Sequence, residues 1–164
     1  MKKQLKISHK KGLNFNRHFT QDTVHPFKQV KWEKRVAEIK DWETGEVAFR
    51  QDDIEFPDFW SQRSTDIVAS KYFRGHLGKP GRESSLKELV GRIADTISGW
   101  GKKMNYFATK DDALSFNHEL THILLHQMAA FNSPVQFNVG IRTKPQCSAC
   151  FINSVDDSME SIMK

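Results

Sequence analysis

The sequence of 164 residues contains only two cysteines, Cys147 and Cys150, too few for the disulfide framework of a small secreted protein. It also lacks an apolar run near the roughly 20 residues that cross a bilayer. Its start, MKKQLKISHKKGLNF, has no apolar segment typical of a signal peptide. These absences predict a cytoplasmic protein with no membrane partner. A hydrophobic fraction of 38% suffices for one modest core.

The net charge of +5 is concentrated near the N-terminus. Residues 1–40 contain eleven Lys or Arg and three Asp or Glu, whereas residues 41–164 contain fourteen and seventeen. Because such a segment attracts phosphates, one hypothesis is a small basic nucleic-acid-binding module. The alternative is a solvated extension that packs on another part of the protein. We favour the extension because no nucleic-acid recognition motif accompanies the charge.

Periodicity predicts a hairpin followed by helices. Apolar and polar residues alternate around a Glu-Thr-Gly turn signal, which is typical of a β-hairpin within residues 30–56. Apolar residues then recur at helical spacing over residues 58–75. The clearest helix begins after Ser85, which forms a capping box with Glu88, and its apolar face ends before Gly101.

The last third of the chain is predicted to change from helix to strand. A third helix is expected over about residues 109–130, because Pro134 disfavours helical geometry in the residue before it. Alternating apolar residues over 135–141 predict a strand, and a second apolar stretch follows at 149–152. The end, SVDDSMESIMK, starts an amphipathic helix that is too short to be stable alone, so we expect the sequence to stop before its structural unit does.

Within the third helix, His118-Glu119-Leu120-Thr121-His122 matches the H-E-x-x-H pattern of zinc metallopeptidases. Such an enzyme turns both histidines towards a cleft and takes a third ligand from elsewhere. At about 100° per residue, His118 and His122 fall opposite an apolar face centred on Leu120. Because no third ligand stands at a suitable spacing, we interpret them as exposed histidines on a solvated face and predict no metal site.

The Cys147-Ser-Ala-Cys150 segment raises a parallel question, because one C-x-x-C is half of a zinc site or a thioredoxin-like redox pair. The second half-site and the βαβ unit that these readings require are missing. A mixed zinc site of His118, His122, Cys147 and Cys150 is the least favoured alternative. The remaining interpretation is one functional thiol beside an incidental one.

Five separated sequence blocks indicate a protein family more specifically than either of these short motifs. In chain order they are WSQRSTDIVASKYFRG, RESSLKELVGRIADTISGWG, YFATKDDALSFNHELTHILLHQ, FNSPVQFNVG and QCSACFINSVDDSMESIM. They closely resemble the N-terminal part of adenosylcobalamin-dependent (class II) ribonucleotide reductases. The similarity covers about Gly45 to the last residue with family-like spacing, so it is more specific than a five-residue zinc pattern. It assigns Glu119, Leu120 and Gln127 to an EL…Q core and makes His118 a local variation.

The resemblance implies a mainly α N-terminal domain followed by the first strands of the family's ten-stranded α/β barrel, here incomplete. We therefore expect a basic N-terminal extension at 1–48, a helical domain at 49–131, and the first barrel strands with the start of a helix at 132–164. The family reduces ribonucleotides, here expected to be ribonucleoside diphosphates, by a cysteine thiyl radical. Adenosylcobalamin is the implied radical source, and a thioredoxin-like protein is the implied reductant.

The same match implies roles for individual residues. Cys150 corresponds to the first member of the cysteine pair that supplies reducing electrons, on the opening barrel strand. Ser133 and the backbone at Ala149 and Cys150 are implied to contact the substrate nucleotide. Ser133 follows a helix and precedes a proline, so its hydroxyl is available to phosphate or ribose oxygens.

Two departures from the family pattern accompany the match. Gln136 stands where family members commonly have tryptophan in S-P-V-W-F-N. The sequence also ends before the segments that carry the radical cysteine and the second reducing cysteine. We therefore expect no reductase activity without a complementary C-terminal chain or segment.

Overall fold

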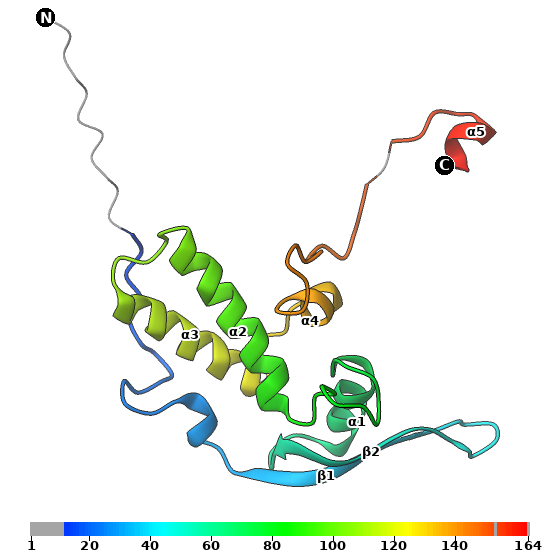
Figure 1. The fold of residues 1–164 in the computed structure, drawn as a ribbon, viewed down its shortest axis with the longest axis horizontal. Helices are drawn as coiled ribbons and strands as arrows, with labels where there is room; N and C mark the ends of the chain where they lie inside the picture. Colours follow the sequence, from blue (N-terminus) through cyan, green and yellow to red (C-terminus); the bar gives the residue numbers. More distant parts are fainter. Residues whose placement is uncertain (1–11, 153, 164) are drawn as a thin grey trace, which may run out of the picture.

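The computed structural model describes residues 12–152 and 154–163. The basic clusters KK and HKK of the predicted extension lie outside these residues. Within the described part, Figure 1 shows a two-stranded sheet at one side of the body, with the helices α2 and α3 packed beside each other above it. The fold is a small mixed α/β domain.

The predicted hairpin is confirmed. Strands β1 (Trp32–Lys40) and β2 (Val47–Pro57) form an antiparallel pair. In the connecting turn, an Asp41 side-chain oxygen accepts hydrogen bonds of 2.9 Å from two successive backbone N–H groups, and Gly45 has a φ of +73°. The domain boundary predicted after residue 48 falls inside β2, whose partner strand lies in the predicted extension.

Three helices correspond to the three predicted ones: α1 (Gln62–Lys71), α2 (Leu86–Lys103) and α3 (Lys110–Leu125). The capping box of α2 is confirmed, because the Glu88 carboxylate accepts a 3.0 Å hydrogen bond from the Ser85 N–H. The helix α3 ends five residues before the predicted position, and a left-handed residue with a φ of +56° at position 127 follows its C-cap.

The strand predicted at 135–141 is wrong, because the structure has a helix there, α4 (Ser133–Asn138). The Asn132 side chain caps it by accepting a hydrogen bond from the Val135 N–H at 3.2 Å. Val135 and Val139, four residues apart, are both buried on one side of this turn. Residues 149–152 are described as irregular, and a final helix, α5 (Met159–Ile162), lies near the end.

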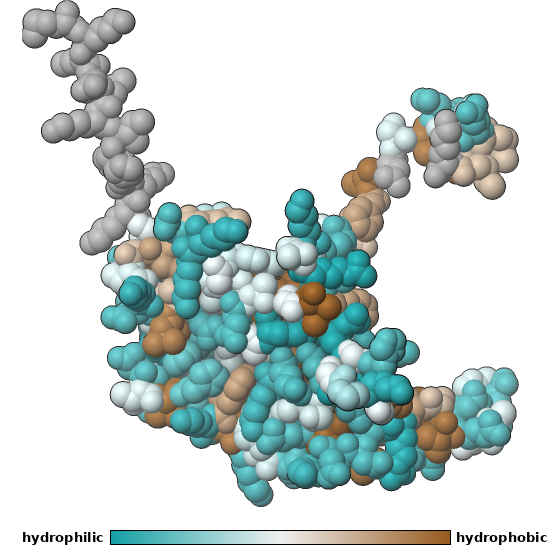
Figure 2. Space-filling view, in the orientation of Figure 1, coloured by the Kyte–Doolittle hydropathy of each residue, from teal (hydrophilic) through white to brown (hydrophobic). Residues whose placement is uncertain are grey.

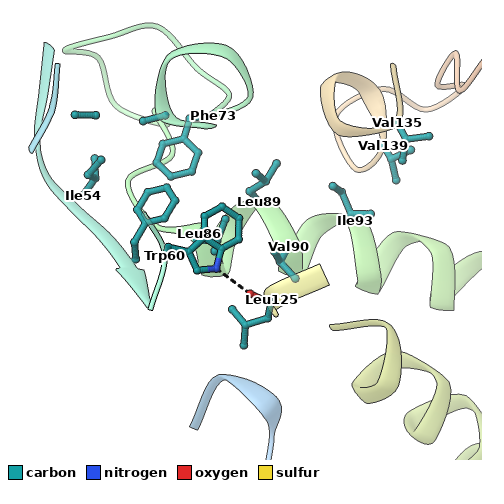
Figure 3. Close-up of a cluster of buried hydrophobic side chains, with 13 residues drawn as sticks. Ile54, Trp60, Phe73, Leu86, Leu89, Val90, Ile93, Leu125, Val135 and Val139 are labelled. Atoms are coloured by element: carbon teal, nitrogen blue, oxygen red, sulfur yellow. Dashed lines mark hydrogen bonds between the residues drawn. The ribbon is translucent and has the colours of Figure 1, made fainter. Parts of the chain in front are cut away.

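The core joins the sheet to all four larger helices. Figure 3 shows apolar side chains from β2, the α1 region, α2, α4 and the end of α3 converging on one another. At its centre, the Trp60 indole N–H donates a 2.9 Å hydrogen bond to the buried carbonyl oxygen of Leu125. This bond satisfies a polar group that the core would otherwise leave unpaired, and it ties the start of α1 to the end of α3.

The segment after α4 leads away from the body and ends in α5 (Figure 1). From Phe151 onward its apolar side chains are exposed, with Ile152 fully so, and Figure 2 shows brown and tan atoms along this projecting part. No helix in the described ranges has the length and apolar character required to span a membrane.

Candidate functional site

Residues 13–28, here called the N-terminal strap, run along α3 before reaching β1. At one end, the Leu13 N–H and carbonyl bond to the backbone of Tyr106 and Ala108 at 2.7 and 2.9 Å. Further on, the Phe15 N–H donates to the Asp112 carboxylate at 2.7 Å. The short 3-10 helix η1 (Pro26–Lys28) closes the strap, so residues about 100 positions apart lie side by side.

Glu119 of the H-E-x-x-H segment makes the largest set of hydrogen bonds between α3 and this strap. Its carboxylate accepts hydrogen bonds from the Thr20 hydroxyl at 2.6 Å, the Thr20 N–H at 2.9 Å and the Phe19 N–H at 3.0 Å. Desolvation raises the pKa of Glu119, but these hydrogen bonds outweigh it and hold the pKa below its ordinary value. The carboxylate therefore binds the strap in its charged form.

The structure corrects the interpretation of the histidines as exposed. His118 is only 6% exposed, and its Nδ1 lies 3.0 Å from the guanidinium of Arg17. The His122 ring stacks on Phe19 at 5.2 Å and on His126 at 4.1 Å. The polar face of α3 is thus covered by the strap, which the periodicity of α3 alone does not reveal.

Burial depresses the pKa values of these histidines. Desolvation lowers the pKa of His118, and the charge of Arg17 lowers it further. Desolvation is also the main cause of the lowered pKa values of His25, His122 and His126. The folded protein therefore favours neutral imidazoles at the contact between the strap and α3.

A loss of stability on mild acidification follows. A histidine with a lowered folded pKa binds its proton more readily in the unfolded chain, so its contribution is full above the unfolded value near 6.5 and is lost as the pH falls towards the folded pKa. We expect the free energy of unfolding to decrease from pH 7.5 to pH 5, by at most about 1.4 kcal/mol per pH unit for each histidine. Urea unfolding at several pH values measures this.

A matched pair of variants locates the effect. Replacing the buried His118 by Gln should flatten the dependence of stability on pH, whereas His76→Gln, at an exposed position, should leave it unchanged. Equal pH profiles for His118→Gln and the unmodified protein would contradict a role for this contact.

The described part of the chain shows no arrangement of side chains that fits the zinc-site interpretations. Within residues 12–152 and 154–163, no group of three His, Cys, Asp or Glu side chains could hold a metal ion. The carboxylate of Glu119, which would act as the base of a metallopeptidase, is instead occupied by the strap. The H-E-x-x-H segment therefore serves as a docking face within the protein.

Two arginines of the described N-terminal region, Arg17 and Arg35, serve internal contacts. Arg35 is 10% exposed in its side chain, and it donates to the Thr65 hydroxyl at 2.9 Å and to the Asp58 carbonyl at 3.0 Å. Arg17 pairs with Asp22 at 3.1 Å. These two guanidinium groups are therefore not available to bind phosphates. The structure gives the nucleic-acid hypothesis no further support.

Ser133, the first predicted substrate contact, is the first residue of α4 and is half-buried. Its hydroxyl lies 3.1 Å from the hydroxyl of Tyr72, at the end of α1. The backbone of α4 is held in turn by Arg92 of α2, which donates to the carbonyls of Gln136 and Val139 at 2.8 and 2.9 Å. Tyr72 and Arg92 are functional candidates that the sequence alone did not indicate, because they lie far from Ser133 along the chain.

The predicted contacts Ala149 and Cys150 lie in the segment after α4, where both are exposed. The two thiols are free and unbonded to each other: Cys150 is exposed, whereas Cys147 is half-buried and packs against the core. Within the described residues, no hydrogen bond joins Ser133 to Ala149 or Cys150. The structure does not bring the three predicted contacts into one bonded cluster.

An apolar cavity of about 370 Å³ opens beside α4. It lies among α1, α2 and the segment that joins α3 to α4, and Tyr72 and Gln136 line it. Gln136, which the resemblance sets at a position where tryptophan is expected, donates from its side-chain amide to the Phe131 carbonyl at 3.0 Å. The amide thus closes a local turn at this position.

Comparison with known proteins identifies the class to which this arrangement belongs. Residues 33–127 match the family model described as class II vitamin B12-dependent ribonucleotide reductase. This stretch runs from β1 to the end of α3 and so contains the hairpin, the three main helices and the H-E-x-x-H segment.

Individual relatives agree. The chain is 52% identical over 153 residues to the vitamin B12-dependent ribonucleotide reductases of Streptomyces clavuligerus and Streptomyces coelicolor, and 41% identical over 183 residues to that of Rhodopirellula baltica. These alignments cover 93% of this chain but 16%, 16% and 18% of the relatives. The chain belongs to the class II vitamin B12-dependent ribonucleotide reductase family.

Proposed function

We propose that this chain forms the N-terminal part of a class II ribonucleotide reductase that converts ribonucleoside diphosphates to deoxyribonucleotides. The observation that carries the proposal is the 52% identity over 93% of the chain to relatives named as such reductases. Since the chain spans about 16% of those relatives, the radical chemistry belongs to the remainder of the enzyme. The role of this part is to bind substrate and to supply one reducing thiol.

Cys150 is the proposed redox residue of this part. In the reaction, the ribose loses its 2′-hydroxyl as water while two cysteine thiols are oxidised to one disulfide. A thioredoxin-like reductant then returns the disulfide to two thiols. Cys150 is a free, exposed thiol outside any helix or strand, so a cysteine carried by another element can reach it.

The substrate contacts of this part are proposed to be Ser133 and the backbone at Ala149 and Cys150. The hydroxyl of Ser133 is a donor with two acceptor lone pairs, and Tyr72 occupies one of these positions. The exposure of Ala149 leaves its backbone accessible to a nucleotide. A remaining part of the enzyme would hold these separated contacts around one substrate.

The cofactor of the complete enzyme is proposed to be adenosylcobalamin, whose cobalt–carbon bond supplies the radical when it is bound. The described residues do not fit this group. The apolar cavity beside α4, of about 370 Å³, and a hollow of about 530 Å³ near the start of α3 have the volumes of small-ligand pockets, and a corrin macrocycle with its side chains is far larger. We therefore assign cobalamin binding to the remainder of the enzyme.

Reconstitution tests this function. We define a hybrid reductase as a fusion in which this chain replaces the aligned N-terminal part of the Streptomyces coelicolor relative. With adenosylcobalamin, a dithiol reductant and CDP, we expect the hybrid reductase to form the deoxyribonucleotide. The isolated chain should form none, because it lacks the remaining segments of the active site.

Two controls accompany this assay. The relative without its aligned N-terminal part should be inactive, which shows that the activity of the hybrid depends on this chain. Turnover by the isolated chain would contradict the proposal that the radical chemistry belongs to the remainder of the enzyme. A folded hybrid that binds cobalamin without reducing CDP would contradict the proposed function.

A further inference from the structure

A tyrosine from another helix holds the hydroxyl of Ser133. The Tyr72 hydroxyl lies 3.1 Å from the Ser133 hydroxyl, although the residues are 61 positions apart. The Tyr72 ring also stacks on Phe137 of the same helix α4, with centroids 5.2 Å apart and planes inclined by 25°. Stacking leaves the phenol little freedom to turn away, so Ser133 meets a fixed partner.

Arg92 fixes the helix that carries Ser133. Its guanidinium donates to the carbonyls of Gln136 and Val139, near the C-terminal end of α4, and to the Tyr72 carbonyl at 3.2 Å. These last carbonyls of a helix have no partner within it, so a cation is well placed there. One side chain thus joins α4 to the residue that holds Ser133.

The anchor itself is buried and paired. The Arg92 and Glu83 side chains are 11% and 10% exposed, and their charged groups meet at 2.6 Å. The second oxygen of Glu83 accepts the Arg74 N–H at 2.7 Å, which fixes the carboxylate. Because both oxygens of the Glu83 carboxylate are bonded, the Arg92 guanidinium is held in one orientation, in which it donates to the α4 carbonyls.

The end of α4 also lies close to the α2 backbone. Gly140 has a φ of +78°, and a Cβ at this position would lie 2.9 Å from the carbonyl oxygen of Arg92. Only glycine fits both the conformation and the space. Gly140 and the Arg92 side chain therefore set the distance between α2 and the C-terminal end of α4.

We infer that Tyr72 and Arg92 are positioning residues for Ser133 in nucleotide binding, an inference that rests on the proposed function. When Tyr72 donates its proton to the Ser133 oxygen, the Ser133 O–H is left to donate to an oxygen of the nucleotide. Donation into a hydroxyl also strengthens the bond that this hydroxyl gives. Arg92 holds α4 at the distance at which the two hydroxyls meet.

A double-mutant cycle in the hybrid reductase tests this role. We expect Tyr72→Phe and Ser133→Ala each to raise the KM for CDP about tenfold, the effect of one lost hydrogen bond to a polar ligand, while kcat stays nearly constant. Because Tyr72 acts through Ser133, the double variant should have the KM of Ser133→Ala alone. A merely structural role would lower the amount of active enzyme without this pattern in KM.

The chain offers a matched control, since Tyr106 is its only other tyrosine and is exposed. Tyr106→Phe should leave KM unchanged. The positioning role would be overturned if the rise in KM of the double variant were the product of the two single rises. It would also be overturned if KM were normal in Tyr72→Phe and raised in Ser133→Ala. An unchanged KM in Ser133→Ala would overturn it together with the role of Ser133.

Hydrogen exchange on the isolated chain separates failure of this inference from failure of the proposed function. Arg92→Lys keeps a charge beside Glu83 but loses the planar fork that reaches two carbonyls. We expect the amide of Val139, which bonds to the Val135 carbonyl within α4, to exchange faster in this variant. Unchanged exchange would overturn the role of Arg92, even where the hybrid reductase shows no activity.

Discussion

Glu119→Ala is expected to lower the free energy of unfolding by about 2–3 kcal/mol, because it removes the charged acceptor of several strap hydrogen bonds. The backbone N–H groups of Phe19 and Thr20 and the Thr20 hydroxyl all lose their shared partner. The His118 and His122 rings, which the strap covers, would then meet water more often. Urea unfolding of the unmodified protein and the variant measures the difference.

Limited proteolysis shows where the stability is lost. Arg17 lies in the strap, so trypsin should cut after it faster in Glu119→Ala, since local opening exposes the backbone. Glu43→Ala is a matched control, because this carboxylate belongs to an exposed turn of the hairpin. Equal stability and equal cleavage after Arg17 in both variants would show that another contact holds the strap.

The elements that the sequence predicted correctly are those whose information is local. The hairpin depends on strand alternation around a turn in which Asp41 and Gly45 satisfy the backbone within five residues. The helix α2 depends on a capping box and on an apolar face of its own residues. Such signals require no knowledge of which segment lies opposite.

The helix α4 shows why a local pattern misled. Alternating apolar residues over 135–141 fit a strand, but Val135 and Val139 are also four apart and fit one face of a helix. The Asn132 cap and the Arg92 side chain, which binds the carbonyls at the other end, select the helix. The second of these comes from α2, so tertiary contact decided the structure.

The prediction that the polar face of α3 is exposed was wrong for a related reason. The positions of His118 and His122 opposite Leu120 were derived from helical geometry, but their exposure depends on whether another segment covers that face. The strap that covers this face is about 100 residues away in the sequence, and no residue pattern within α3 indicates that such a segment packs there. The face that carries His118 and Glu119 is polar because the strap offers it an arginine side chain and backbone N–H groups.

Cys150→Ser is expected to abolish multiple turnovers of the hybrid reductase, whereas Cys147→Ser should retain most of the activity. A serine cannot form the disulfide that balances loss of the 2′-hydroxyl, so each enzyme molecule would lack its route back to the reduced state. The fall in kcat should exceed about 100-fold, the scale seen when a group that takes part in the reaction is removed. Deoxyribonucleotide formed per enzyme measures it.

The surroundings of the two thiols explain the choice between them. Cys147 packs against the core, and its sulfur lies 3.7 Å from the Pro145 carbonyl, so movement towards a second cysteine would disturb packed residues. Cys150 is exposed, and iodoacetamide should therefore alkylate it faster than Cys147 in the isolated chain. If Cys147→Ser abolishes turnover while Cys150→Ser remains active, the redox role belongs to Cys147, and the neighbouring substrate contacts must be reassigned with it.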